Sequence, residues 1–201
     1  MSDVRNDIQA DERADAATTE SDQAHDRPYA KLFDSHCHVN EERFDEDREE
    51  VLERMANYGI ARYAVIGSDM ETSRACVEYS ADHPDAACAV GIHPHEAKGF
   101  RDEDIDQLRD WITAGEANAI GEIGLDYYYD LSPREVQAEV CRKQMELAWE
   151  LGSSVAFHIR DAHQDMLEIM KSMKKRLTPG IIHCFSGSAE IAKEYHSPES
   201  P

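Results

Sequence analysis

Six short apolar runs recur along this chain, and stretches with helical periodicity separate them. The runs cover residues 32–39, 63–67, 87–93, 119–125, 155–159 and 180–185. Apolar runs of this length are typical of buried strands, and strands that alternate with helices favour a parallel sheet. Such βαβ units have one preferred hand, which restricts the possible topologies. The alternation therefore predicts an α/β fold with parallel strands.

Helix start and stop signals lie between the apolar runs. We expect helices over about 51–58, 71–83, 103–114, 132–152 and 162–176, and a sixth that begins near residue 188. The sequence Ser132-Pro133-Arg134-Glu135 is typical of an N-cap, a proline at the first helical position and a capping-box glutamate. The helices and strands together span most of residues 29–195, which we expect to form one domain.

The two ends of the chain lack such periodicity. Residues 1–28 are acidic, and Val4 and Ile8 are almost their only large apolar residues. A segment of this composition buries too little surface to offset the entropy of ordering, so we expect a disordered tail. Residues 196–201 fit neither a helix nor a strand. We expect a second, irregular tail there.

The overall charge argues against broad electrostatic binding of nucleic acid. Forty-two acidic residues oppose 21 basic ones, for a net charge of −21. A nucleic-acid substrate would have to be held by metal ions and a few local cations. The five cysteines form no CxxC pair, and no apolar run is long enough to cross a membrane. We therefore expect a reduced, cytoplasmic protein without membrane contact, and the sequence leaves the oligomeric state open.

His36 and His38 lie two residues apart in the first apolar run. Side chains at this spacing share one side of a strand, so the two imidazoles could form half of a metal site. More candidate ligands accompany the later runs, namely His93, His95, Glu122, His158 and His183. The carboxyl ends of parallel strands meet at one end of a barrel or sheet, where active sites lie.

Each candidate has an ordinary structural interpretation on its own, because a single histidine at a strand end is commonly a satisfied polar residue. Glu122 is harder to explain in this way, since a buried carboxylate is costly unless it meets a cation. Gly121 and Gly124 flank it and would let the backbone approach a neighbour closely. Mixed histidine and carboxylate ligands suit Zn²⁺ or Mn²⁺, with Mg²⁺ also possible, and a carboxylate can bridge two such ions. The joint pattern favours a polynuclear metal site.

Five ordered segments of the chain resemble the TatD family of metal-dependent hydrolases. They are Asp34-Ser35-His36-Cys37-His38, Gly91-Ile92-His93-Pro94-His95, Gly121-Glu122-Ile123-Gly124-Leu125-Asp126-Tyr127, His158-Ile159-Arg160-Asp161-Ala162 and His183-Cys184-Phe185-Ser186-Gly187. The resemblance implies a TIM-barrel-type fold and a divalent-metal-dependent deoxyribonuclease that cleaves DNA phosphodiester bonds. About six of the eight strands of the family barrel are found in this chain.

The resemblance also implies roles for individual residues. His36 and His38 would bind one metal ion, His158 and His183 a second, and Glu122 would bridge the two as the central catalytic group. His93, Asp126 and Arg160 would lie near the scissile phosphate and bind substrate, although Asp126 could instead orient a ligand. His95 is expected at the surface or behind the ligands. The tyrosines at 127–129 could stack on bases or pack on the barrel rim.

Two alternatives stay open at this point. The family aspartate on the eighth strand has no counterpart here, so the chain could be a truncated and catalytically inactive fragment. It could also be an amidohydrolase-like enzyme that acts on C–N or carboxyl ester bonds. Amidohydrolases commonly use a bridging lysine, however, and Glu122 in the middle strand favours phosphodiester chemistry.

Overall fold

The structure is a computed structural model that describes residues 31–173 and 175–196. Its centre is one sheet of six parallel strands in the order β1-β2-β3-β4-β5-β6. The strands are β1 Leu32–Cys37, β2 Ile60–Ile66, β3 Ala86–Val90, β4 Ala119–Asp126, β5 Ser154–Arg160 and β6 Gly180–His183. Each predicted apolar run overlaps one strand, so the predicted α/β fold with parallel strands is confirmed.

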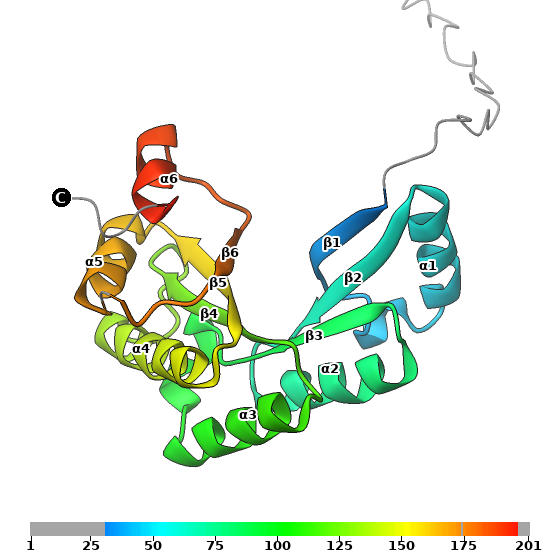
Figure 1. Cartoon of the computed structure of the whole chain (residues 1–201), viewed down its shortest axis with the longest axis horizontal. Coiled ribbons are helices and arrows are strands. Elements are labelled where there is room, and N and C mark those ends of the chain that lie inside the picture. Colours follow the sequence, from blue (N-terminus) through cyan, green and yellow to red (C-terminus); the bar gives the residue numbers. More distant parts are fainter. Residues whose placement is uncertain (1–30, 174, 197–201) are drawn as a thin grey trace, which may run out of the picture.

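Helices connect successive strands and cover the outer face of the curved sheet (Figure 1). They are α1 Arg48–Asn57, α2 Met70–Asp82, α3 Asp102–Ala114, α4 Arg134–Leu151, α5 His163–Met173 and α6 Ala189–His196, with short 3-10 helices η1 Glu42–Phe44 and η2 Pro94–Gly99. Gly115 and Gly152 end α3 and α4 in the left-handed conformation that glycine favours. No helix within the described residues is long and apolar enough to cross a membrane.

The predicted N-cap of the fourth helix is wrong. Helix α4 begins at Arg134, and the residue before it is Pro133. The Ser132 hydroxyl instead donates to the carbonyl of His95 (2.8 Å) and accepts from the backbone N–H of Lys98 (3.1 Å). Ser132 therefore ties the loop after β4 to η2 rather than capping a helix, which the local motif could not show.

The sheet curves into a nearly closed TIM-barrel-type fold. Strands β1 to β3 and strands β4 to β6 form its two sides, with β1 and β6 at the two edges (Figure 1). Within the described residues β1 and β6 share no ladder of backbone hydrogen bonds. Their carboxyl ends nevertheless meet, because the imidazoles of His36 and His183 stack with ring centroids 3.5 Å apart. The curvature therefore brings the first and last strand ends to one place.

Burial is greatest in the middle of the sheet. Ile120, Ile123 and Leu125 of β4 are fully buried, whereas Leu32 and Phe33 of β1 are about half exposed. Gly124 lies against β5 at a φ of 144°, and a Cβ there would overlap the carbonyl oxygen of His158. The close approach predicted for this glycine is thus present.

The two predicted tails lie almost entirely outside the described residues. Residues 1–28 and 197–201 belong to the ranges that the structure does not describe. His196, the first residue of the predicted second tail, is the last residue of α6.

Candidate metal centre

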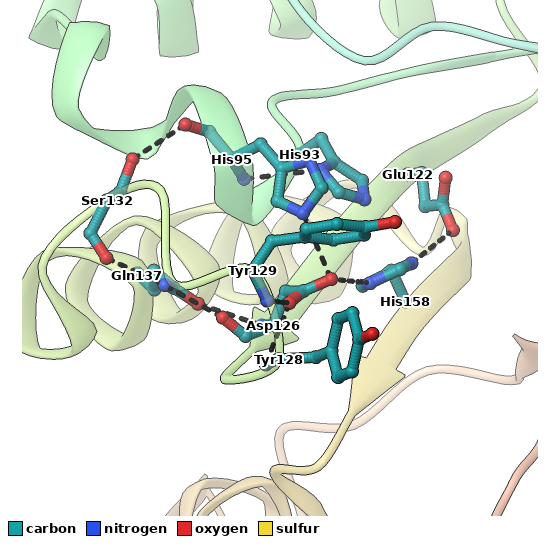
Figure 2. A network of polar contacts seen from close by, with 9 residues as sticks. All are labelled: His93, His95, Glu122, Asp126, Tyr128, Tyr129, Ser132, Gln137 and His158. Atoms are coloured by element: carbon teal, nitrogen blue, oxygen red, sulfur yellow. Dashed lines mark hydrogen bonds and ion pairs between the residues drawn. The ribbon is translucent and has the colours of Figure 1, made fainter.

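The carboxyl ends of the strands carry the titratable side chains that the sequence singled out. Glu122 and Asp126 come from β4, His158 from β5, and His183 ends β6. His93 and His95 lie at the start of η2, directly after β3. Figure 2 shows most of this network from close by. The barrel geometry therefore gathers side chains that are up to 147 residues apart, from His36 to His183.

Glu122 lies at the centre of this arrangement and is 5% exposed. Its Oε2 is 3.5 Å from Nε2 of His36, and its Oε1 is 3.2 Å from Nδ1 of His158. Burial alone would raise the pKa of Glu122, but the hydrogen bond with His158 and the neighbouring imidazoles outweigh it and hold this pKa at about 2. Glu122 is therefore an ionised, buried carboxylate between imidazoles from two strands.

Asp126 is fully buried and makes four hydrogen bonds through its carboxylate. Its Oδ1 accepts from the backbone N–H groups of Tyr128 (3.0 Å) and Tyr129 (2.8 Å). Its Oδ2 is 3.0 Å from Nε2 of His95 and 2.8 Å from Nε2 of His158. Burial raises the pKa of Asp126, but these donors outweigh it and hold the pKa at about 2. All four acceptor positions of the carboxylate are thereby filled.

His158 lies between the two carboxylates. Because ionised Asp126 can only accept, His158 directs an Nε2–H group at it, and its Nδ1 faces Glu122. Burial lowers the pKa of His158, but the hydrogen bonds to Glu122 and Asp126 outweigh it and raise this pKa above its ordinary value. Nδ1 of His158 and Oε1 of Glu122 lie 3.2 Å apart and would otherwise face each other with lone pairs. Either a second proton on the imidazole, carried by Nδ1, or a divalent cation between the two atoms removes this repulsion. An imidazole fixed by a carboxylate on its far nitrogen is the usual form of a metal-ligating histidine.

His93 presents a hydrogen-bond donor to the site. Its Nδ1 accepts from the backbone N–H of His95 (3.2 Å), which caps η2. Burial lowers the pKa of His93 to about 3, so the ring is neutral near pH 7 and carries its proton on Nε2. A neutral imidazole with this tautomer can donate to an oxygen of a bound substrate. It has no free lone pair for a metal ion.

Two groups of three candidate ligands lie close together among the described residues. One group contains His36, Glu122 and His183, and the other contains His93, His95 and His158. Within each group the candidate ligand atoms all lie within 4.8 Å of one another. The first group fits a cation well, because it combines the buried carboxylate of Glu122 with Nε2 of His36, 3.5 Å away. Burial lowers the pKa of His36 to about 4, which keeps this ring neutral and able to act as a ligand.

The structure divides the predicted site residues between the two groups and the surface around them. His183 is grouped with His36, whereas His158 is grouped with His93 and His95. His38 lies outside both groups, and its Nδ1 is 3.4 Å from Glu41 although its ring centroid is 5.2 Å from that of His36. The guanidinium of Arg160 lies over the ring of Tyr128, with Cζ 3.9 Å from the ring centroid.

His95, expected at the surface or behind the ligands, contacts Asp126 through its Nε2 (3.0 Å). The sequence interpretation missed two residues that shape the site, Gln137 and Gln144. Buried Gln137 and Gln144 of α4 each clamp the backbone of one residue. Gln137 accepts from the N–H of Asp126 (2.8 Å) and donates to its carbonyl (3.1 Å), and Gln144 does the same at Ile92 (2.8 and 3.0 Å). Two buried glutamines seven residues apart on one helix face could have indicated such clamps.

Comparison with known proteins identifies the family of this chain. Residues 33–199 match the family described as TatD related DNase. An uncharacterized metal-dependent hydrolase of Bacillus subtilis, YabD, is 39% identical over 163 residues, which cover 81% of this chain and 64% of that protein. A protein of Cronobacter sakazakii named 3'-5' ssDNA/RNA exonuclease TatD is 32% identical over 165 residues, covering 81% of this chain and 62% of its own length.

Solved structures give the same result for the fold. The TatD homologue YJJV of Escherichia coli k12 superposes with a TM-score of 0.76 at 27% identity, over 84% of this chain and 65% of that one. An uncharacterized amidohydrolase of Saccharomyces cerevisiae superposes with a TM-score of 0.72 at 19% identity, which is a likeness of fold. The chain spans less than two thirds of the length of the relatives named here. With a family match over most of its length, the chain belongs to the TatD family.

Proposed function

We propose that this chain is a metal-dependent hydrolase that cleaves phosphodiester bonds of DNA through a site for two divalent cations. The observation that carries this proposal is the buried carboxylate of Glu122, which lies between His36 of β1 and His158 of β5. A carboxylate that reaches imidazoles on both sides is suited to bridge two ions. Zn²⁺, Mn²⁺ and Mg²⁺ are all compatible with parts of this donor set.

In this proposal the cation ligands are His36, His38, Glu122, His158 and His183. The group of His36, Glu122 and His183 supports one ion, and the pair of His158 and Glu122 supports the other. His38 takes part only when its imidazole leaves Glu41, to which it now lies close. When bound, divalent cations lower the pKa of water and neutralise charge on a phosphoryl group.

The remaining residues of the site would act on the substrate or on the ligands. The Nε2–H of neutral His93 would donate to a phosphate oxygen, and Arg160 would add positive charge near it. Asp126 has its acceptor positions filled by Tyr128, Tyr129, His95 and His158. We therefore assign Asp126 to positioning His158 rather than to direct contact with the substrate.

The relatives support nucleic acid as the substrate class. The Cronobacter sakazakii protein is named an exonuclease of single-stranded DNA and RNA. A net charge of −21 repels a polyanion at long range, so binding would depend on the cations of the site and on Arg160.

Metal content and cleavage together test the proposal. The purified chain is loaded with Mn²⁺, Mg²⁺ or Zn²⁺, its metal content is measured, and single- and double-stranded DNA are offered. We expect about two ions per chain and metal-dependent cleavage that Glu122→Gln abolishes. Glu116→Gln, an exposed site just before β4, is the matched control and should cleave normally. A folded, metal-loaded chain that leaves all DNA intact would overturn the proposal.

A further inference from the structure

Two neighbouring tyrosines beside the candidate metal centre are unusually exposed. Tyr128 and Tyr129 are 58% and 54% exposed, whereas Tyr63 of β2 is 6% exposed. Within the described residues, the hydroxyls of Tyr128 and Tyr129 have no hydrogen-bond partner, while that of Tyr127 bonds to Asp165 (2.7 Å). Tyr127 therefore packs as a structural residue, and its two neighbours present aromatic surface to the solvent.

Arg160 completes an aromatic and cationic surface with these rings. Its Cζ lies 3.9 Å from the ring centroid of Tyr128 and 4.9 Å from that of Tyr129. Among residues 31–173 and 175–196, no carboxylate pairs with this guanidinium, in contrast to Arg134, which pairs with Asp130 (3.0 Å). The N–H groups of Arg160 thus stay available to an anion while its flat face rests on an aromatic ring.

The same tyrosines are fixed to the candidate metal centre through Asp126. Their backbone N–H groups both bond to its Oδ1, and its Oδ2 holds His158 (Figure 2). The ring of Tyr129 also lies edge-on to that of His95, with centroids 5.4 Å apart. The exposed rings consequently have a set position relative to the ligands, although they are on a loop.

We propose that Tyr128, Tyr129 and Arg160 form a stacking site for an unpaired nucleobase whose adjoining phosphate enters the metal centre. Every nucleobase has an aromatic face, so such a site accepts any sequence but requires a base that is free of its duplex partner. Arg160 would contact the phosphate of the same nucleotide. The site would therefore make the chain prefer single-stranded over double-stranded substrates. This inference rests on the proposed function, because it names the part of that substrate which the site recognises.

Fluorescence of 2-aminopurine tests stacking without cleavage. A short single-stranded DNA that carries 2-aminopurine at its end and a cleavage-resistant terminal linkage is titrated with the Mg²⁺-loaded protein, so that the cations of the site stay in place while cleavage stops. We expect the wild type to quench the fluorescence and the double variant Tyr128→Ala/Tyr129→Ala to bind about tenfold more weakly or worse. The variant Tyr128→Phe/Tyr129→Phe keeps both rings and should behave as the wild type. Tyr58→Ala, which removes a tyrosine that is 67% exposed at the end of α1, is the matched control.

Cleavage assays provide the second readout, in which the terminal base of the substrate is replaced by an abasic nucleotide. The wild type should lose about tenfold in kcat/KM on the abasic strand, and the double alanine variant should show no further loss there. A merely structural role of the tyrosines would lower cleavage of both strands equally. The ratio of single-strand to double-strand cleavage should also fall in the alanine variant.

The two proposals fail in different ways. If the wild type cleaves DNA but does not quench 2-aminopurine, or if the alanine variant keeps its strand preference, the stacking site is wrong and the proposed function stands. If the wild type cleaves no nucleic acid, the proposed function is wrong. Loss of quenching in the phenylalanine variant would also overturn the stacking site, because it would assign binding to the hydroxyls.

Discussion

His93, His95 and His158 come from the β3–β5 side of the barrel and are braced by hydrogen bonds to Asp126 and to the backbone. His36 and His183 come from β1 and β6, which share no backbone hydrogen bonds in the described part of the chain, and they meet by ring stacking. On the braced side the fold fixes the side chains by itself. On the open side, Nδ1 of His36 is buried without a partner, and its Nε2 faces the Glu122 carboxylate across 3.5 Å, a gap that a cation would fill.

The two sides of the site therefore have different tasks. A ligand group that keeps a polar atom unsatisfied is costly without its ion, so its geometry depends on metal. A group whose hydrogen bonds are complete can orient a substrate in the absence of metal. Glu122 belongs to both sides, because its Oε2 faces His36 on the open side and its Oε1 faces His158 on the braced side.

Removal of Glu122 should therefore have the largest effect, since it breaks both sides at once. We expect Glu122→Ala to lower kcat/KM by roughly two to three orders of magnitude, because it removes the charge that would hold both cations. Steady-state cleavage together with metal content checks this prediction. Normal metal content and activity in Glu122→Ala would show that neither side depends on this carboxylate.

Two single variants, His36→Ala and His38→Ala, test the open side alone. His36 belongs to the group with Glu122 and His183, whereas Nδ1 of His38 lies 3.4 Å from Glu41. We expect His36→Ala to weaken metal binding by more than the roughly 10–100-fold that the loss of an outer hydrogen-bond partner costs, and His38→Ala to have a smaller effect. Calorimetric titration with Mn²⁺ or Zn²⁺ measures both. Equal losses of metal affinity in the two variants would show that His38 is a metal ligand to the same extent as His36.

On the braced side, Asp126→Asn separates positioning of a ligand from binding of substrate. The amide has only one acceptor oxygen, which cannot serve both the two backbone N–H groups and the two imidazoles that Asp126 now binds, so the orientation of His158 should be lost. We expect metal affinity and kcat/KM to fall together, by about 10–100-fold. A lower kcat/KM with unchanged metal affinity would instead support direct contact of Asp126 with the substrate.

The sequence predicts those parts of the molecule that leave a local pattern of apolar and polar residues. Alternating apolar runs locate all six strands, because burial of strands between helices leaves a strong local pattern. His36, Glu122 and His158 are found because a polar residue in an apolar run is conspicuous. Whether His38 faces Glu41 or the metal centre depends on side-chain rotation after β1 ends, which leaves no trace in residue spacing.

The side-chain to backbone hydrogen bonds that support the braced side cannot be predicted from the sequence either. Ser132 looks like a helix cap, but its hydroxyl bonds to the carbonyl of His95 in η2, 37 residues away. The clamp that Gln137 makes on Asp126 likewise requires α4 to lie against β4, which only the tertiary structure specifies. Such side-chain to backbone contacts are set by packing between elements and have weak local signals.

A change in one of these clamps should produce the smallest effect and show whether the braced side is held by the fold alone. Gln137→Leu leaves the buried N–H and carbonyl of Asp126 without their partner, which should cost about 1–3 kcal/mol of the free energy of unfolding. Tm should fall by several degrees while the metal affinity of the folded chain changes little.

Gln164→Leu on the exposed face of α5 is the matched control and should shift stability by no more than about 0.5 kcal/mol. Thermal unfolding and metal titration of both variants decide the matter. If Gln137→Leu weakens metal binding as strongly as Asp126→Asn does, the clamp positions the ligands, and the braced side depends on α4 as well as on its own hydrogen bonds.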